Sequence, residues 1–400
     1  MRRSKTWSLL AGAVVLAVLA GCGSSGGASS VPAKGSDGPS GAPIKLFQYG
    51  MLKSTVASFP ELESGALAAV KAINADGGVG GRPLALDSCN DEADANKALA
   101  CARKGIASGA IADVGTVSIA GAQVLPLFEA AKMPYVAPSA IAPIEKTSKY
   151  SFLIDGSTLT SYGGIAPWAD RLVHAKKIAV VYSDNASKPG NQVAMRYGTD
   201  KVGQSIVKEV TLPLNTIDLS PYISQLRSSG ADAVFGALTP DDVIKYWKAA
   251  KAQGMDVPFF TIVSTLDAKS VAAAGGGAEG SYLVSQFPDV AGDEPSVVQF
   301  RKDMEKYSPG AALNPVSLRA YGGVQLVAAA LRTVKGEPTK EALQAALERF
   351  DGKFLWIPHL SFSDPGPFTS APRAVVSNAW AFRVKGTTFA PLGNGVPIEL

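Results

Sequence analysis

The sequence predicts an α/β protein built from two doubly wound parallel-sheet lobes. Short β-rich runs alternate with amphipathic or alanine-rich helical stretches along most of the 400 residues, a pattern typical of parallel sheets covered on both faces. The alternation breaks near residues 150–160 and then begins again. About 357 residues follow position 43, too many for one comfortable core. We therefore expect two lobes, with a ligand site at the carboxyl ends of the strands, in the cleft between them.

The first block opens with IKLFQYGML at residues 44–52, which we interpret as a strand. A helix follows at 61–77 and ends at a glycine, the residue that most often terminates helices. The alternation then continues with a strand at 82–89, a helix at 92–109, a strand at 110–118, a helix at 121–132 and a strand at 133–140.

The second block repeats the pattern before the C-terminal third departs from it. Its strands are expected at 176–184, 205–212, 231–238 and 258–263, and its helices at 191–203, 220–230 and 240–254. Three helices then follow in near succession at 295–307, 317–334 and 339–350, with β-like segments at 354–364 and 373–392.

These last segments lead us to expect a chain that crosses between the lobes three times. The helices would return to the first lobe and the final strands would complete the second. The limits that follow are 44–156 and 288–362 for lobe 1, and 157–287 and 363–400 for lobe 2. The crossings that would act as hinges are expected near Gly156, Pro288 and Ser363.

The N-terminus has the composition of an export signal. Three cations within the first five residues precede an apolar run from Trp7 to Ala20, which is shorter than the roughly 20 residues of a membrane-spanning helix. The run ends in LAGC and looks like a bacterial lipobox, so we expect a signal peptide at 1–21 and a lipid anchor on Cys22. An ordinary signal peptide with a chance cysteine is the alternative. Residues 22–43 are rich in Gly, Ser and Pro and suit a tether.

Export places the chain on the outer face of the cytoplasmic membrane, or on the periplasmic side in a two-membrane host. In an oxidising compartment the two remaining cysteines, Cys89 and Cys101, favour a disulfide of about 3 kcal/mol. Two buried free thiols are the alternative. We expect no metal, because neither His174 nor His359 lies near the cysteines in sequence and their spacing matches no common zinc pattern.

The charge balance gives no sign of a nucleic-acid partner, and we expect none. The formal net charge is +4, but three of the cations leave with the signal peptide, so the mature chain carries +1. The pI of 8.8 therefore says little, and no cluster of Lys and Arg suggests a nucleic-acid surface.

Several motifs together resemble one family. ESGALAAVKAINADGGVGGRPLALDSCNDEADANKALACARK, at 63–104, has a helix ending in an INA-x-GG-[IV]-x-G pattern, then a strand and an acidic turn around a cysteine. It looks like the opening of the leucine/isoleucine/valine-binding group of type I periplasmic binding proteins. The likeness continues through 115–140, 176–185 and 230–254, and covers roughly residues 44–287.

With the lipobox, this resemblance implies the lipid-anchored solute receptor of an ABC importer. A small-molecule solute and the permease subunits would be its partners, it would need no cofactor, and it would be a monomer. The family pairs the cysteine that matches Cys89 with one in its serine-bearing turn. That turn has no cysteine in this chain, and Cys101 offers a substitute.

The resemblance also implies ligand contacts in the first lobe. Ser118 belongs to the serine turn, where its hydroxyl and the neighbouring backbone N–H groups would hold a carboxylate near a helix N-terminus. The next loop supplies Ser139, Ala140 and Ile141. Ile141 stands where the family usually has a threonine that helps to hold an ammonium group. Phe59 belongs to a loop that reaches toward the cleft in the family.

In the second lobe the expected contacts are Ser187, Leu238 and Val263. The first two stand where the family commonly has an aromatic residue, and Val263 aligns with the acid that pairs with an amino acid's ammonium. A buried ammonium without a partner is costly, so a small organic acid or amide with an apolar body and no amine is favoured. The alternative is that the alignment slips by a residue or that Asp267 replaces the acid, which restores a branched-chain amino acid.

Enzyme signals are present but out of context, so we expect no enzyme. Ser205 begins an S-x-x-K pattern, yet it opens a strand, follows an SDN triplet at 183–185 and precedes no K-T-G. GGGAEG at 275–280 fits G-x-G-x-x-G but leads into a strand, not a helix. A membrane-anchored hydrolase is therefore the weakest alternative. A sensor that reports ligand to a membrane receptor is stronger, because it needs the same closed, liganded form.

Overall fold

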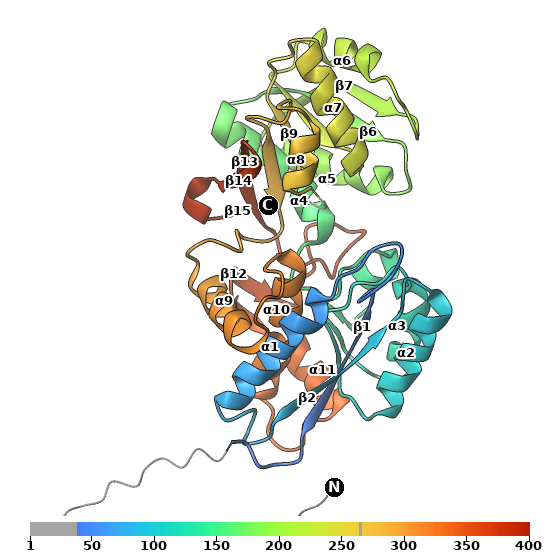
Figure 1. Ribbon diagram of the computed structural model, residues 1–400, viewed down its shortest axis with the longest axis vertical. Helices are drawn as coiled ribbons and strands as arrows, with labels where there is room; N and C mark the ends of the chain where they lie inside the picture. Colours follow the sequence, from blue (N-terminus) through green and yellow to red (C-terminus); the bar gives the residue numbers. More distant parts are fainter. Residues whose placement is uncertain (1–37, 264–265) are drawn as a thin grey trace, which may run out of the picture. The chain divides into compact units, whose positions relative to one another are not determined.

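A computed structural model describes residues 38–263 and 266–400. The signal peptide, Cys22 and most of the tether lie outside these residues. The described chain contains two mainly parallel β-sheets with helices against them (Figure 1), so the predicted α/β class with parallel sheets is confirmed. No helix within the described ranges is long and apolar enough to cross a membrane.

The first sheet has five parallel strands in the order β2-β1-β3-β4-β5. Its strands are β1 (Ile44–Gly50), β2 (Leu84–Asn90), β3 (Asp113–Val114), β4 (Tyr135–Val136) and β5 (Ser151–Phe152). The strands predicted at 110–118 and 133–140 are far shorter in the structure. Gly115 and Ala137, the residues that follow β3 and β4, have φ of +69° and +54°, so the extended conformation ends there.

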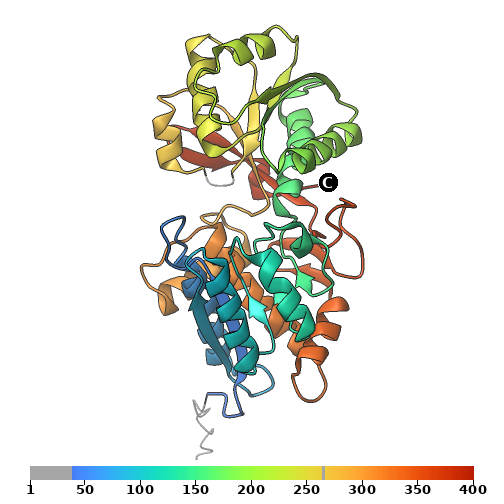
Figure 2. The same cartoon turned by 90° about the vertical axis from the view of Figure 1, so that its right-hand side faces the viewer.

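Helices cover both faces of this sheet (Figures 1 and 2). One face carries α2 (Ala95–Ala107) and α3 (Gly121–Ala130), coloured cyan, and the other carries α1 (Glu61–Ala75) and α10 (Pro315–Leu331). The predicted start of α2 at residue 92 is three residues early, because the Asp94 side chain accepts hydrogen bonds from the backbone N–H groups of Asn96 and Lys97 and caps the helix.

Two helices far apart in the sequence lie side by side on this sheet. A Cβ on Gly65 of α1 would come 2.3 Å from the carbonyl oxygen of Ser317 on α10, so only glycine permits this approach. The Asn314 side chain donates to Glu61 Oε1 at 2.8 Å. The same region contains α9 (Pro295–Tyr307) and α11 (Lys340–Glu348).

The disulfide expected from the cysteine count is present. It joins Cys89 on β2 to Cys101 on α2, with the Cα atoms 5.7 Å apart, within the usual range for a disulfide. The bond therefore ties a strand to the helix that covers it.

The second sheet extends a parallel core with antiparallel strands. The order is β14-β13-β10-β9-β8-β6-β7, and β15 pairs with β13. The parallel strands are β6 (Lys177–Ser183), β7 (Ser205–Leu212), β8 (Ala233–Ala237), β9 (Phe259–Ile262) and β10 (Tyr282–Ser285). The antiparallel strands are β13 (Asn378–Lys385), β14 (Thr388–Pro391) and β15 (Ile398–Glu399). Residues 351–354 and 357–361 form a separate pair, β11 and β12.

The helices against this sheet include two that the sequence pattern did not predict. α5 (Lys188–Lys201), α6 (Ser220–Arg227) and α7 (Pro240–Ala252) match predicted helices, whereas α4 (Ser157–Val173) and the short α8 (Ala268–Ala273) do not. In α4, a Cβ on Gly164 would meet the Ala379 Cβ at 2.5 Å, and the Trp168 indole donates to the Ala379 carbonyl at 3.0 Å. Tertiary packing against β13 therefore overrides the low helix propensity of its glycines.

Three chain segments connect the two sheets, at 153–156, 286–294 and 362–377. Thr160 of α4 bridges the first and the third, because its hydroxyl is 3.0 Å from the Gly156 carbonyl and 2.9 Å from the Val376 carbonyl. The predicted hinge positions near Gly156, Pro288 and Ser363 fall in these segments, while the lobe limits themselves stay predictions.

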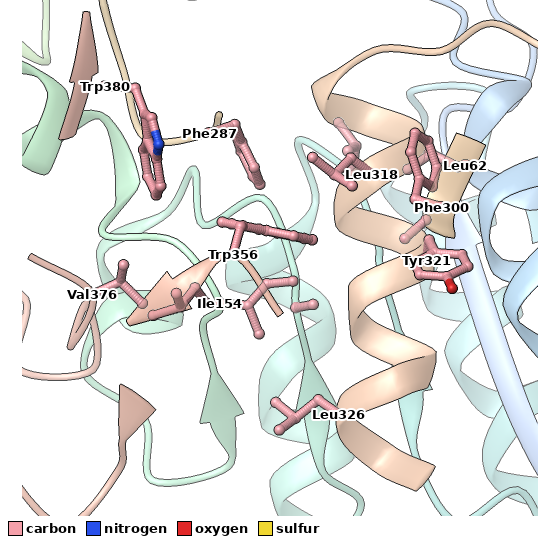
Figure 3. Packing of buried hydrophobic residues seen from close by; sticks show 14 of the residues in the cluster. Leu62, Ile154, Phe287, Phe300, Leu318, Tyr321, Leu326, Trp356, Val376 and Trp380 are labelled. Atoms are coloured by element: carbon pink, nitrogen blue, oxygen red, sulfur yellow. The ribbon is translucent and has the colours of Figure 1, made fainter. Parts of the chain in front are cut away.

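A buried apolar cluster runs through all three connections. It includes Ile154 from the first, Phe287 from the second and Val376 from the third. Figure 3 shows these residues near Trp356, whose ring centroid lies 6.0 Å from that of Phe287. The connections are therefore part of the core and not loose linkers.

Candidate functional site

A cavity of about 400 Å³ opens at the carboxyl ends of strands from both sheets. Met51 and Val117 reach it from the ends of β1 and β3, and Ser139 from the loop after β4. Val263 and Ser285 reach it from the ends of β9 and β10. β1 and β3 are neighbours at the point where the strand order reverses, which is where open α/β sheets bind ligands. We call it the Arg319 cavity, because Arg319 alone is charged among its described lining residues.

Three large apolar side chains face water at this cavity. Val56, Ile119 and Ile141 are 72%, 53% and 49% exposed, and all three line it. Scattered exposed apolar residues need no explanation, but three around one cavity favour a ligand with an apolar body.

Arg319 lies on α10 with its guanidinium at the cavity wall. Its Nε donates to Asp155 Oδ2 at 2.9 Å, and its Nη2 lies 2.9 Å from the same oxygen. The guanidinium carbon is 4.9 Å from the centroid of the Phe287 ring, a cation–π distance. Among the described residues Nη1 has no hydrogen-bond partner, so this nitrogen is available to an acceptor on a ligand.

The other polar groups of the cavity are neutral. Gln286 Oε1 accepts from the Ser161 hydroxyl at 2.6 Å, which leaves its amide N–H groups for a ligand. The hydroxyls of Ser139 and Thr158 have no side-chain partner within the described ranges. The cavity thus offers one cation and several neutral donors but no carboxylate among its described lining.

A second cavity of about 520 Å³ adjoins the first. We call it the Phe389 cavity. The two share part of their walls, formed by Phe59, Val263, Ser285, Pro315 and Val316. Three carboxylates line the Phe389 cavity, those of Glu61, Asp267 and Asp289.

The structure brings four of the eight expected ligand contacts together. Phe59, Ser139, Ile141 and Val263 line the Arg319 cavity, and Ala140 lies in the same loop without lining it. Asp267, the alternative acid, lines only the Phe389 cavity. Its Oδ1 accepts from the Ser270 N–H and hydroxyl at 2.8 Å each, which caps α8.

Ser118, Ser187 and Leu238 line neither cavity. The Ser118 side chain is 1% exposed, and its hydroxyl donates to Asp91 Oδ2 at 2.5 Å. Ser187 is exposed just before α5, and Leu238 is packed in the core. Ser187 follows β6 and Leu238 follows β8, whereas in the second sheet the cavity lies at the ends of β9 and β10. Their role in binding stays a prediction.

Arg319, Thr158 and Gln286 were not expected from the sequence. One signal was available for Arg319, since it is a lone cation in the otherwise uncharged helix PVSLRAYGGVQLVAAAL. A single buried arginine on an apolar helix needs a partner, and here that partner is Asp155, distant in the sequence.

Three buried acids, Asp91, Asp113 and Glu145, lie on or between the strands of the first sheet. Burial raises the pKa of the Asp91 and Glu145 carboxyls, and it raises the pKa of Asp113 well above its usual range. Glu145 Oε1 accepts from the Tyr135 hydroxyl at 3.1 Å, while Asp113 Oδ2 has no partner among the described residues. None of these acids lines the Arg319 cavity. No group of three His, Cys, Asp or Glu side chains in the described ranges is arranged to hold a metal.

Comparison with known proteins gives one family. The sequence profile described as periplasmic binding protein matches residues 53–388. The Leu/Ile/Val-binding protein homolog 8 of Brucella abortus is 29% identical over 265 residues, 62% of this chain and 60% of that relative. The chain thus spans about 60% of the length of this relative. The leucine-, isoleucine-, valine-, threonine- and alanine-binding protein of Pseudomonas aeruginosa is 25% identical over 314 residues, 76% of this chain and 82% of that protein.

Solved structures share the fold. The leucine-, isoleucine-, valine-, threonine- and alanine-binding protein from Brucella ovis, in a closed conformation, gives a TM-score of 0.71 at 18% identity over 90% of this chain and 97% of that one. The fatty acid ABC transporter substrate-binding protein from Thermomonospora curvata gives 0.68 at 18% identity, over 89% and 92%. At these identities the likeness carries the fold alone.

Proposed function

The chain belongs to the periplasmic binding protein family, and on that premise we propose that it is the extracytoplasmic solute-binding receptor of an ABC importer. The resemblance to the leucine/isoleucine/valine-binding group is confirmed by the family match and the relatives. The family consists of binding proteins, which agrees with the expectation that the chain is not an enzyme. The ligand would bind between the two sheets, near the segments that connect them. Permease subunits would then recognise the liganded form.

The proposed ligand is an amine-free organic acid with an apolar body. The observation that carries this proposal is the Arg319 cavity, whose described lining has one cation and no carboxylate. A ligand carboxylate would accept from the unpartnered Nη1 of Arg319, and Val56, Ile119 and Ile141 would cover its apolar part. An ammonium group would find no counter-charge there and would be costly to bury.

A branched-chain amino acid is the second candidate, because the relatives are named for such ligands. In that case Asp267 or another acid of the neighbouring Phe389 cavity would have to reach the ammonium group. Titration calorimetry of the purified protein separates the two. We expect isovalerate and benzoate to bind and leucine and valine not to, and micromolar binding of leucine would overturn the acid proposal.

A matched pair of variants tests the role of Arg319 in this proposal. Arg319→Gln combined with Asp155→Asn removes both charges of the buried pair, and we expect it to lose acid binding at least tenfold. Arg383→Gln, on the exposed part of β13, is the control and should bind as the unaltered chain does. Unchanged acid binding by the double variant would rule out Arg319 as the carboxylate partner.

We further propose that Cys22, which lies outside the described residues, carries the lipid that holds the mature chain at the membrane as a monomer. Cys22→Ser should release the protein from the membrane fraction. The alternative output is a sensor that signals to a membrane receptor. Liganded protein that stimulates ATP hydrolysis by its reconstituted permease would favour transport, and a failure to do so would favour the sensor.

A further inference from the structure

We propose that the ligand extends from the Arg319 cavity into the Phe389 cavity, which makes it a monocarboxylate with a chain of medium length, about eight to twelve carbons. This inference rests on the proposed function, since it names the ligand class of the same site. A ligand of the size of leucine would leave the Phe389 cavity without an occupant, and the proposed tail supplies one.

The first step is the adjacency of the two cavities. Phe59, Val263, Pro315 and Val316 line both, so a ligand that passes these side chains extends from one cavity into the other. Each cavity, at about 400 and 520 Å³, falls within the range of a whole small-molecule site. A ligand with only a four-carbon side chain would leave the Phe389 cavity to water.

The second step is the chemistry of the Phe389 cavity. Beyond the shared wall its apolar lining residues are Leu266, Pro288, Val290, Phe382 and Phe389, and its polar ones are Asn314 and three carboxylates. Phe382 and Phe389 belong to β13 and β14, the antiparallel strands added to the second sheet. A chain of methylene groups is the simplest occupant of such walls, because every buried methylene is favourable and needs no hydrogen bond.

The third step is charge, which orients the ligand. Glu61, Asp267 and Asp289 line the Phe389 cavity. Their described contacts are hydrogen bonds to backbone and neutral side chains: Asn314 donates to Glu61, Ser270 to Asp267, and the Ala291 N–H to Asp289. Three carboxylates repel an anionic head, whereas Arg319, which is paired with Asp155 through Nε and Nη2, still has Nη1 to donate to it. The carboxylate therefore lies at Arg319 and the tail lies in the Phe389 cavity.

The test is a titration of the full chain with straight-chain carboxylates from butyrate to dodecanoate, each below its micelle concentration. We expect affinity to rise about fourfold per methylene well beyond six carbons. Phe389→Glu should weaken decanoate binding more than tenfold and leave butyrate binding unchanged. Thr388→Glu, the exposed neighbour on β14 that lines neither cavity, is the matched control and should bind both acids normally. Val290→Glu, on a different segment, repeats the test if Phe389→Glu unfolds the edge strand.

The outcomes separate this inference from the proposed function. Short acids that bind with no gain from chain length would overturn the extended ligand and leave the proposed acid receptor standing. Leucine that binds while no acid does would overturn both. Tighter binding of 8-aminooctanoate than of octanoate would overturn the apolar tail, because the three carboxylates would then serve as a cation site.

Discussion

The Nε and Nη2 atoms of Arg319 each lie 2.9 Å from one oxygen of Asp155. The other oxygen of Asp155 accepts from the backbone N–H of Ser157 at 2.8 Å. Arg319 is 6% and Asp155 1% exposed, so this ion pair is withdrawn from water. It joins α10 to the first connection between the sheets, at the wall of the candidate site.

Breaking this pair on one side should be costly. Arg319→Met leaves the Asp155 carboxylate buried without its cation, and we expect a loss of about 3–5 kcal/mol in the free energy of unfolding. Asp155→Asn added to Arg319→Met should recover most of that loss, because no uncompensated charge remains. Urea unfolding followed by circular dichroism measures both. Lys97→Met at the exposed Glu92–Lys97 pair is the control and should change stability by less than about 1 kcal/mol.

The exposed apolar wall should matter for binding and not for folding. Ile119→Ser removes a side chain that is already half in water, so unfolding should shift by no more than about 0.5 kcal/mol. Affinity for the best-binding acid should fall about fivefold, because the ligand loses that apolar contact. Ile217→Ser is the control, since Ile217 is 90% exposed and lines neither cavity. Equal affinities for the two variants would contradict the assignment of this wall.

We expect the same substitution, glycine to alanine, to have opposite effects on stability at two positions. A Cβ on Gly156 would lie 1.6 Å from Thr160 Oγ1 and 2.1 Å from the Val376 carbonyl, so Gly156→Ala should force two connections apart and cost about 3 kcal/mol. In α5, a Cβ on Gly190 would meet only Leu159 Cδ2, at 3.6 Å. Gly190→Ala should instead stabilise by about 0.5–1 kcal/mol. Thermal unfolding of both variants gives the comparison.

The buried Asp113 should impose a pH dependence on stability. Burial raises its pKa well above the ordinary value of 3.8, so the folded chain keeps a proton that the unfolded chain has lost. The stability of the unaltered chain therefore falls as pH rises from about 4 to the raised pKa. Asp113→Asn carries no such proton, so its stability relative to the unaltered chain should increase over that window and then level off.

Asp232→Asn is the control, and its effect on the pH dependence of stability should have the opposite sign. The backbone N–H groups of Lys177 and Lys176 lower the pKa of the Asp232 carboxyl. That carboxylate contributes stability above the ordinary value, and the contribution is lost as pH falls through the lowered pKa. Asp232→Asn should thus be less stable than the unaltered chain at neutral pH and equal to it in strong acid. If the stabilities of the two variants, each relative to the unaltered chain, gave parallel curves between pH 3 and 8, this account would be contradicted.

Much of the fold could be predicted because local pattern and tertiary structure agree over most elements. The local pattern and the tertiary structure disagree where long-range packing determines the backbone conformation. Gly163 and Gly164 lie inside α4, which forms because it packs closely against β13. The strands around Gly115 and Ala137 end early because both residues adopt positive φ, which no periodicity reveals.

The site was predictable only in part, for a reason of sequence distance. Phe59, Ser139, Ile141 and Val263 follow recognisable motifs, and they line the Arg319 cavity. Arg319 lies on a helix that packs beside α1 from the far end of the chain, so its place at the cavity depends on long-range packing. The two cavities likewise meet through Pro315 and Val316 of that helix.

The exposed wall formed by Val56, Ile119 and Ile141 sets a calorimetric signature. Apolar surface in contact with water raises the heat capacity of the chain, and covering that surface lowers it again. The enthalpy of binding should therefore become more negative as temperature rises, whatever its sign at 25 °C. The slope of that enthalpy against temperature measures how much of the wall a ligand covers, and it does so before the chemical identity of the ligand is known.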